Sequence, residues 1–343
     1  MGSVKDLEVL KKPTNDEMGI GRFHFSDRYS IFDWGEMPNS IKNKGSVLCT
    51  IGAYCFERLE EKGIKTHYRG LIQDGKLVKT DELKAPTSTM EICLVRVFHP
   101  KAHRLAGKLT YDYGVFKPNL TNFLIPLEII YRNGLPEGSS VFDRLNAELK
   151  PEDLGLNHPP RPGDKLEKPI FDVSTKLEER DRYITWIEAQ EFAGLSNEEI
   201  GEIKDILIHI DDFITETASK AGLENEDGKI EFGFDPSRKP MVVDVVGTLD
   251  ECRFTYNGVQ VSKEIARQYY KGTNWYKDIV EAKKEASIKG IKDWKSLCQS
   301  TPPKLDHDLK KMISEMYMAT ANELTKIHLF DVPKLADILA SIA

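Results

Sequence analysis

The chain has 343 residues, enough to bury a large core, and its length corresponds to roughly two domains of average size. Hydrophobic residues make up 40% and charged residues 30%, a composition typical of soluble globular proteins and not of disordered ones. The 48 basic against 55 acidic residues leave a net charge of −7, which argues against a nucleic-acid binder that works by broad phosphate neutralisation. No apolar run approaches the roughly 20 residues of a membrane span or resembles a signal peptide, so we expect a cytoplasmic protein with no membrane partner.

The cysteine and histidine patterns do not favour a metal or redox site. The five cysteines are scattered without a CxxC pair, so we expect buried, reduced thiols. His99 and His103 have a spacing that could ligate zinc on a helix, but Pro100 argues against a helix there. The chain also lacks the motifs of P-loop hydrolases, Rossmann dehydrogenases and esterases, so these classes have no support.

Hydrophobic periodicity predicts the first elements. Alternation over residues 23–26 indicates a half-buried strand, and the apolar spacing over 48–59 predicts a helix that stops at Gly63. Residues 101–122 are rich in Gly, Pro, Asn and Tyr and indicate an inserted loop or irregular hairpin. Residues 124–131 then return to strand character.

The middle of the chain combines a proline-rich segment with two helix starts. Residues 150–169 contain five prolines and little periodicity, so we expect a surface loop throughout. Thr185 with Glu188, and Ser196 with Glu199, each form the pattern of a capping box at a helix N-terminus.

Two strands are expected between the helices of the C-terminal half. The second capping box opens a long amphipathic helix over 200–214, and a strand pair follows at 229–234 and 241–246. Leu309, Ile313 and Met316 are spaced as the core-facing stripe of a further helix.

The expected strand pair carries the most informative carboxylates. If its turn is symmetric and Asp235 faces Pro240, then Glu231 lies directly opposite Asp244, with both side chains on one face. Like charges so placed repel each other, which raises the pKa of the pair unless a cation lies between them. Two carboxylates completed by phosphate oxygens are typical of a Mg²⁺ site, whereas an exposed hairpin with two solvated acids is the plainer alternative.

Two further groups of residues could bind an anion. Asp250 and Arg253 follow the second strand, where the guanidinium could clamp a phosphate or carboxylate or simply form a surface ion pair. Arg132 ends a strand and is followed by a Gly-rich loop up to Ser140, whose hydroxyls and backbone N–H groups suit an anion, although many loops share this composition.

Several of these residues lie in motifs that follow one another in a fixed order. The segments are Gly2–Leu7 (GSVKDL), Asp27–Asp33 (DRYSIFD), Lys44-Gly45, Pro126–Asn133 (PLEIIYRN) with Gly138-Ser139, Lys168–Glu178 (KPIFDVSTKLE), Asp227–Gly233 (DGKIEFG) and Val243–Arg253. In this order, the chain resembles the SAICAR synthetase family, the phosphoribosylaminoimidazole-succinocarboxamide synthases of purine biosynthesis.

The resemblance implies an α+β fold of two lobes, with antiparallel sheets and flanking helices, related to ATP-grasp proteins. Residues 1–98 would form a small ATP-binding lobe. Residues 99–343 would form a larger lobe with the ribonucleotide, aspartate and Mg²⁺ sites and a helical C-terminal region. Because the 101–122 segment is extra at the expected hinge, the adenine contacts cannot be carried over.

The resemblance also assigns roles to individual residues. Four residues would bind ATP: Ser3, Val4, Lys5 and Lys176. Four would hold the ribonucleotide: Arg132, Ser139, Asp250 and Arg253. Lys229 would lie near the reacting carboxylate, which makes Lys229 and Lys176 the expected catalytic residues. Glu231 and Asp244 would bind Mg²⁺, in agreement with their spacing across the hairpin.

The chain departs from the family pattern in four places. Ser3 replaces a lysine of the opening loop, Val245 replaces a glutamate after the expected metal ligand, and Leu249 replaces a proline. The loop between Arg132 and Gly138 is one residue longer than the common form. These changes indicate a divergent branch and leave room for an altered substrate.

The implied activity is that of an ATP-dependent ligase. It would join the carboxylate of 5-aminoimidazole-4-carboxylate ribonucleotide to the amine of L-aspartate through an acyl phosphate. A small-molecule kinase on the same fold and a non-catalytic nucleotide-sensing module stay open, although the acidic pair and Lys176 count against the module. The expected partners are ATP, the ribonucleotide and aspartate, and assembly into a homo-oligomer stays open.

Overall fold

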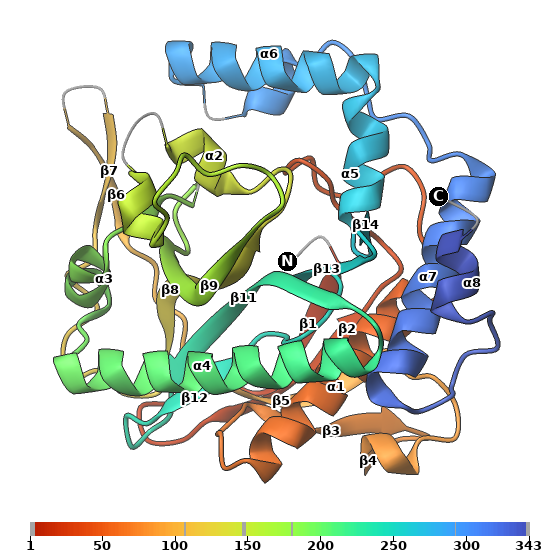
Figure 1. The fold of residues 1–343 in the computed structure, drawn as a ribbon. Helices are drawn as coiled ribbons and strands as arrows, with labels where there is room; N and C mark the ends of the chain where they lie inside the picture. The colour runs from red at the N-terminus through yellow and green to blue at the C-terminus, as the bar shows by residue number, and fades with distance from the viewer. Residues whose placement is uncertain (1–3, 106–107, 146–148, 180, 292, 341–343) are drawn as a thin grey trace.

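The protein has a mixed α+β fold, shown in Figure 1, with a five-stranded and a seven-stranded sheet. The computed structural model describes residues 4–105, 108–145, 149–179, 181–291 and 293–340. The strands are β1 (Lys5–Lys11), β2 (Gly19–Phe25), β3 (Tyr68–Gln73), β4 (Lys76–Val78), β5 (Thr89–Leu94), β6 (Lys101–Leu105), β7 (Lys108–Asp112), β8 (Phe123–Leu135), β9 (Asp164–Thr175), β10 (Tyr183–Ile184), β11 (Glu224–Phe234), β12 (Pro240–Val243), β13 (Cys252–Tyr256) and β14 (Val259–Gln260). The helices are α1 (Lys44–Glu61), α2 (Ser140–Arg144), α3 (Trp186–Ala193), α4 (Asn197–Lys220), α5 (Glu264–Lys271), α6 (Asn274–Lys289), α7 (His307–Thr325) and α8 (Leu335–Ala340), with 3₁₀ turns η1 (Thr80–Glu82), η2 (Pro151–Leu154) and η3 (Trp294–Leu297).

The five-stranded sheet has the order β1-β2-β5-β3-β4 and packs against α1. Along β2, buried and half-buried residues alternate, which confirms the predicted strand. The predicted helix is also confirmed, because its apolar face from Leu48 to Leu59 is buried in α1. Gly63 follows this helix with a φ of +82°, a left-handed conformation that glycine adopts without a steric penalty.

The seven-stranded sheet has the order β10-β9-β8-β11-β13-β14, and β12 also pairs with β11. Its core-facing residues pack against the apolar face of α4, which crosses the front of the sheet in Figure 1. Ile203, Leu207, Ile210 and Ile214 of α4 are buried, as the sequence predicted. Both predicted capping boxes are present at the starts of α3 and α4.

The 101–122 segment contains the hairpin β6–β7, which confirms the hairpin alternative. His103 lies in β6 and His99 outside any helix, so the helical zinc spacing does not arise. All five cysteines are free thiols, and the described residues include no group of three or more potential metal-ligating side chains from His, Cys, Asp and Glu. None of the described helices is long and apolar enough to cross a membrane.

The expectation of a loop throughout 150–169 is wrong in part, because β9 begins at Asp164. Pro169 lies where the pairing register between β9 and β8 shifts, so its missing N–H does not interrupt a regular ladder. Leu166 and Ile170 on either side pack against a small separate apolar cluster, which gives this part of the strand a reason to be ordered.

The predicted register of the β11–β12 hairpin is wrong by one residue. Glu231 pairs with Val243 and Phe234 with Pro240, so Glu231 and Asp244 are not directly opposite. The N–H of Asp235 donates to the carbonyl of Lys239, which closes a three-residue loop instead of the expected four-residue turn. Arg238 has a φ of +58° in this loop, as is typical of three-residue hairpins, and the second strand ends at Val243 and not at residue 246.

The division of the chain into lobes at residue 98 stays a prediction. Residues 5–94 supply the five-stranded sheet, and residues 123–260 supply the seven-stranded one. However, α1 also packs against α7 and α4, and Thr66 forms a bridge to Val242.

The α7 stripe of Leu309, Ile313 and Met316 faces the core as predicted.

We expect Asp211→Asn to stabilise the fold above about pH 6. Asp211 of α4 is buried and accepts hydrogen bonds from Asn133 of β8 and Asn225 of β11, and burial raises its pKa to about 6. A raised carboxyl pKa means that folding is favoured while the group is protonated, and this contribution is lost as the pH rises through about 6. An uncharged Asn should therefore add about 1 to 3 kcal/mol of stability above that pH and little below pH 4.

Denaturant unfolding on both sides of pH 6 measures this difference, with Asp205→Asn on the exposed face of the same helix as the control. Equal destabilisation of the Asp211 variant at both pH values would contradict the argument.

Candidate active site

Charged side chains alternate along three neighbouring strands of the seven-stranded sheet. They are Asp227, Lys229 and Glu231 on β11, Glu128 and Arg132 on β8, and Asp172 on β9. Alternate residues of a strand point to the same face, and the register places Glu128 beside Glu231 and Arg132 beside Asp227. One face of the sheet therefore carries a line of acidic and basic side chains across these three strands.

A lysine–carboxylate cluster occupies one end of this line. It consists of Lys5, Glu128, Lys176, Lys229, Glu231, Asp244 and Glu251. The Nζ of Lys176 lies 2.7 Å from Oε1 of Glu231 and 3.2 Å from Oε1 of Glu128. The Nζ of Lys229 lies 3.0 Å from Oε1 of Glu128 and 3.3 Å from Oε1 of Glu231. Two facing glutamates would destabilise a strand pair, and the two lysines offset their repulsion.

The two lysines stay charged although they are largely buried. Burial disfavours the ammonium of Lys229, but the charges of Glu251, Glu231 and Glu128 outweigh it and raise the pKa. Glu251 is 3.3 Å away, which gives Lys229 a third acidic partner. Glu231 and Glu128 raise the pKa of Lys176 in the same way.

Asp244 joins the cluster from the turn after β12. Its φ of +64° breaks the regular strand, and Lys5 of β1 lies 2.6 Å from its carboxylate. Burial tends to raise the pKa of Asp244, but the charges of Lys5 and Lys229 lower it to about 2. The backbone carbonyl of Asp244 accepts a hydrogen bond from Nε2 of His67, a buried imidazole whose pKa falls to about 4 because burial favours its neutral form.

The expected mutual pKa increase occurs for one member of the acidic pair. Burial and then the charge of Asp244 raise the pKa of Glu231 to about 7. For Asp244 the expectation is wrong, because the sequence did not reveal that Lys5 lies against it.

The donor set of the cluster suits a hard divalent cation. Four carboxyl groups face three ammonium groups, so the cluster carries one negative charge when Glu231 is deprotonated, above a pH of about 7. Glu231 and Asp244 supply oxygen ligands, which Mg²⁺ prefers, and phosphate oxygens and water usually complete such a site. The two carboxylates thus fit a nucleotide-bound Mg²⁺.

An arginine cluster lies at the other end of the line. The carboxylate of Asp227 accepts from Arg253 at 2.8 Å and lies 3.2 Å from Arg132. Arg132 is 1% exposed, lies 2.7 Å from Asp172 and also contacts Ser139. Ser139 caps the N-terminus of α2 by accepting from the Val141 N–H. Three predicted residues, Arg132, Ser139 and Arg253, are thereby joined in one network with Asp227 and Asp172.

Asp250 belongs to a separate buried ion pair. Its carboxylate lies 2.7 Å from Nζ of Lys44 and accepts a hydrogen bond of 3.0 Å from the Tyr317 hydroxyl. Burial opposes the charged form, but Lys44 lowers the pKa of Asp250 to about 2. Lys44 is fully buried, so the pair connects the start of α1 with α7 and the loop after β12.

Val4 lies next to Lys5, and its carbonyl accepts hydrogen bonds from the N–H and hydroxyl of Ser26. Ser3 lies outside the described residues.

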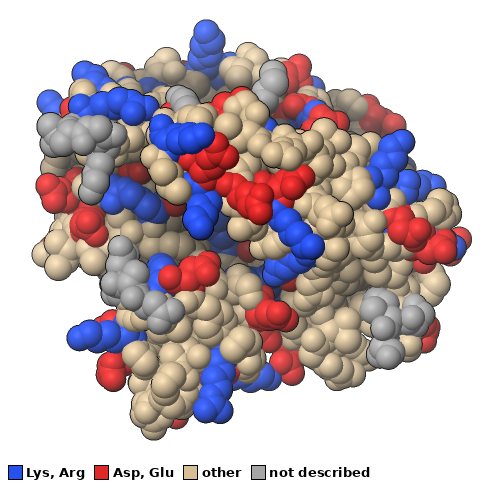
Figure 2. Space-filling model, turned by 90° about the horizontal axis from the view of Figure 1, so that it is seen from above, with Lys and Arg blue, Asp and Glu red and all other residues tan. Residues whose placement is uncertain are grey.

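Figure 2 views the molecule from the side of α2 and α6 and shows lysine and arginine side chains within a recess that acidic side chains border.

Sequence reasoning missed Glu128, Glu251 and the role of Lys44. Glu128 carried a detectable signal, because it is a single charged residue within the apolar run of β8. Lys44 carried none, because only the tertiary structure shows that its side chain is buried.

Known proteins are similar to this chain in sequence and in fold. The family model of SAICAR synthetase matches residues 11–283. A protein of Archaeoglobus fulgidus, provisionally named a phosphoribosylaminoimidazole-succinocarboxamide synthase, is 48% identical over all of this chain and 98% of its own length. The synthase of Thermoplasma acidophilum is 32% identical over 88% of this chain and 92% of its own length.

The chain belongs to the SAICAR synthetase family.

Solved structures agree on the fold. A SAICAR synthetase in complex with ADP has a TM-score of 0.56 at 21% identity, covering 89% of this chain and 99% of that one. The Saccharomyces cerevisiae SAICAR synthase complexed with SAICAR has a TM-score of 0.62 at 20% identity, covering 95% and 94%. These likenesses confirm the predicted α+β fold. The chain is thus an ATP-dependent ligase of the SAICAR synthetase family.

We expect Lys44→Met to destabilise the protein by about 3 to 5 kcal/mol, because it leaves Asp250 charged and buried without its cation. Chemical denaturation measures the loss. The double variant Lys44→Met/Asp250→Asn removes both charges and should recover part of it. A single variant as stable as the native protein would show that the pair contributes nothing.

Proposed function

We propose that this chain joins the carboxylate of 5-aminoimidazole-4-carboxylate ribonucleotide to the amine of L-aspartate, with ATP as the phosphoryl donor. The observation that supports this most directly is the shared sheet face that carries both a lysine–carboxylate cluster and an arginine cluster. The first suits a Mg²⁺-bound triphosphate and the second an anionic ribonucleotide. Family membership sets the reaction class, and the residue roles below are our assignment.

The first step makes the carboxylate reactive. A carboxylate oxygen of the ribonucleotide attacks the γ-phosphorus of ATP, the bond to the β–γ bridging oxygen breaks, and ADP leaves. Lys176 would neutralise the γ-phosphate, and Lys5, with the backbone at Val4, would hold the other phosphates. Lys229 would orient the attacking carboxylate, so that positioning and charge neutralisation lower the barrier.

The second step forms the amide. The aspartate amine attacks the carbonyl carbon of the acyl phosphate, the new C–N bond forms, and inorganic phosphate leaves with the C–O bonding electrons. The amine loses a proton as the amide forms. Arg132, Ser139 and Arg253 of the arginine cluster would keep the ribonucleotide in place through both steps. The fourth residue assigned to the ribonucleotide, Asp250, lies in a separate buried ion pair with Lys44.

Glu231 and Asp244 would hold Mg²⁺, which when bound would neutralise phosphate charge. In the protein without ligand, Lys176 and Lys229 bridge the carboxylates of Glu231 and Glu128. We infer that ATP binding redirects these ammonium groups from the carboxylates toward the phosphates.

The test is incubation with ATP, Mg²⁺, aspartate and the carboxylated imidazole ribonucleotide, with detection of the succinocarboxamide product. Phosphate release should require both the ribonucleotide and aspartate. Phosphate transfer to a hydroxyl acceptor without aspartate would instead indicate the kinase. ATP binding without turnover of any of these substrates would indicate the sensing module.

We expect Asp244→Asn to leave the fold intact, weaken Mg²⁺-ATP binding and abolish most turnover. The substitution keeps the side-chain shape but removes one negative charge from the proposed metal site. Titration of ATP at several Mg²⁺ concentrations measures the affinity. Asp74→Asn is the control, because Asp74 is exposed and its φ of +50° suits Asn. Normal activity and normal Mg²⁺ dependence of Asp244→Asn would rule out the metal assignment.

We expect Arg253→Ala to weaken use of the ribonucleotide and leave ATP affinity nearly unchanged. Losing one bidentate charged contact costs about 1.5 to 3 kcal/mol, to be measured as a fall in kcat/KM for the ribonucleotide. Asp227 keeps Arg132 as a partner, so the network should persist. Arg104→Ala on the exposed β6 strand serves as the control. An equal loss of affinity for both substrates would show that Arg253 is structural.

A further inference from the structure

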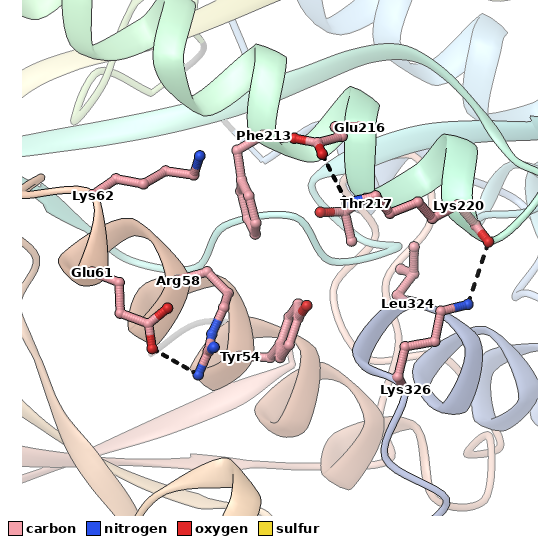
Figure 3. Close-up of a pocket in the computed structure, with 10 residues that line it drawn as sticks. All are labelled: Tyr54, Arg58, Glu61, Lys62, Phe213, Glu216, Thr217, Lys220, Leu324 and Lys326. Carbon is pink, nitrogen blue, oxygen red and sulfur yellow. Dashed lines mark hydrogen bonds and ion pairs between the residues drawn. The ribbon is translucent and has the colours of Figure 1, made fainter.

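A cavity lies between three helices, apart from the candidate active site. It has a volume of about 380 Å³ and opens where the C-terminal ends of α1, α4 and α7 come together (Figure 3). None of its lining residues belongs to the lysine–carboxylate or the arginine cluster. The volume is within the usual range for small-molecule sites.

One wall of the cavity is a single face of α1. Tyr54 and Arg58 are four residues apart in α1, and Lys62 follows as the C-cap residue of the helix. Figure 3 shows all three beside the cavity, with Arg58 turned toward Glu61 and Lys62 extending toward Phe213. The guanidinium of Arg58 lies 5.5 Å from the centre of the Tyr54 ring. Phe213 of α4, which is 7% exposed, supplies an aromatic surface from the other side.

The lining is positively charged overall. Its four cations are Arg58, Lys62, Lys220 and Lys326, and its two acids are Glu61 and Glu216. Glu61 pairs with Arg58 at 2.9 Å, and Glu216 pairs with Lys220 at 2.7 Å. Two positive charges therefore remain in excess.

Two donors are left over in this lining. The Nε of Arg58 is buried and has no hydrogen-bond partner among the described residues. Lys62 forms no ion pair with any acid in the described part of the chain. The C-terminal ends of helices attract cations through their dipoles, and this accounts for Lys326, which donates to the carbonyl of Lys220 at 3.3 Å, and for the position of Lys62 as the C-cap residue of α1. It does not account for the Nε of Arg58, which lacks an acceptor and would gain one if this partly exposed side chain turned toward a bound anion.

The floor of the cavity is apolar. A narrow cleft continues inward past Leu324 to Gly247, which lies in the loop between Asp244 and Asp250.

We propose that this cavity binds a small phosphorylated compound that carries a flat apolar ring. The phosphate accepts from Arg58 and Lys62, and the ring lies between Tyr54 and Phe213. Cations at the rim with aromatic surfaces below them match this combination better than either a free anion or an apolar molecule.

Calorimetric titration with phenyl phosphate tests the proposal, with the nucleotide site filled by ADP and Mg²⁺. We expect a dissociation constant of about 1 mM or tighter. Lys62→Gln and Arg58→Gln should each weaken binding about tenfold or more, whereas Lys277→Gln on the exposed face of α6 should leave it unchanged. Inorganic phosphate should bind more weakly than phenyl phosphate, because it lacks the ring.

A variant that fills the cavity tests whether phenyl phosphate binds there or at another site on the protein. Thr217→Trp should abolish phenyl phosphate binding and leave ligase turnover unchanged, since Thr217 lies outside the active site. Absence of saturable binding to the native protein, or equal affinity in the native, Lys62 and Thr217 variants, would overturn the proposal. Because the readout is binding with ADP present, it does not depend on whether the proposed ligase reaction is correct.

Discussion

The repulsion between two facing glutamates, the buried Glu231 and the half-buried Glu128, is the constraint on which the site depends. The two residues pair across β8 and β11, where burial raises the pKa of Glu231 and so disfavours its charged form. Lys176 and Lys229 approach both of them and convert an unfavourable strand pair into a charge network. In the function we propose, the phosphates of ATP would draw the same lysines away from the glutamates, so the compensation that stabilises the free protein would also prepare it for an anionic substrate.

The two sheets must come together before this site is complete. The five-stranded sheet supplies Lys5, while Asp244 comes from the end of β12 in the seven-stranded sheet. The backbone of residues 65–67 bonds to Val242, and His67 holds the carbonyl of Asp244 from the same segment. These contacts orient Asp244 at its left-handed φ, which turns its carboxylate toward the cluster despite the shifted hairpin register.

Two departures from the family pattern are explained by packing. Val245 and Leu249 are buried, and Val245 lies so close to Gly52 of α1 that a Cβ there would be 2.6 Å from its methyl group. Val245 therefore packs the loop between Asp244 and Asp250 onto α1, and Leu249 anchors the end of the same loop in the core. The loop that carries two proposed site residues is therefore held by core contacts as well as by the Lys44 ion pair.

The sequence by itself determined the elements that depend on local periodicity: the strand at 23–25, the helix ending before Gly63, the two capping boxes and the α7 stripe. It also placed Glu231 and Asp244 in one site, but only the tertiary structure decided how they meet, because a single extra or missing turn residue changes every cross-strand partner. The pairing of Lys5 with Asp244 and of Lys44 with Asp250 was equally inaccessible. Each joins residues more than 200 positions apart, and no local pattern records a contact that only the packing of α1 and the two sheets creates.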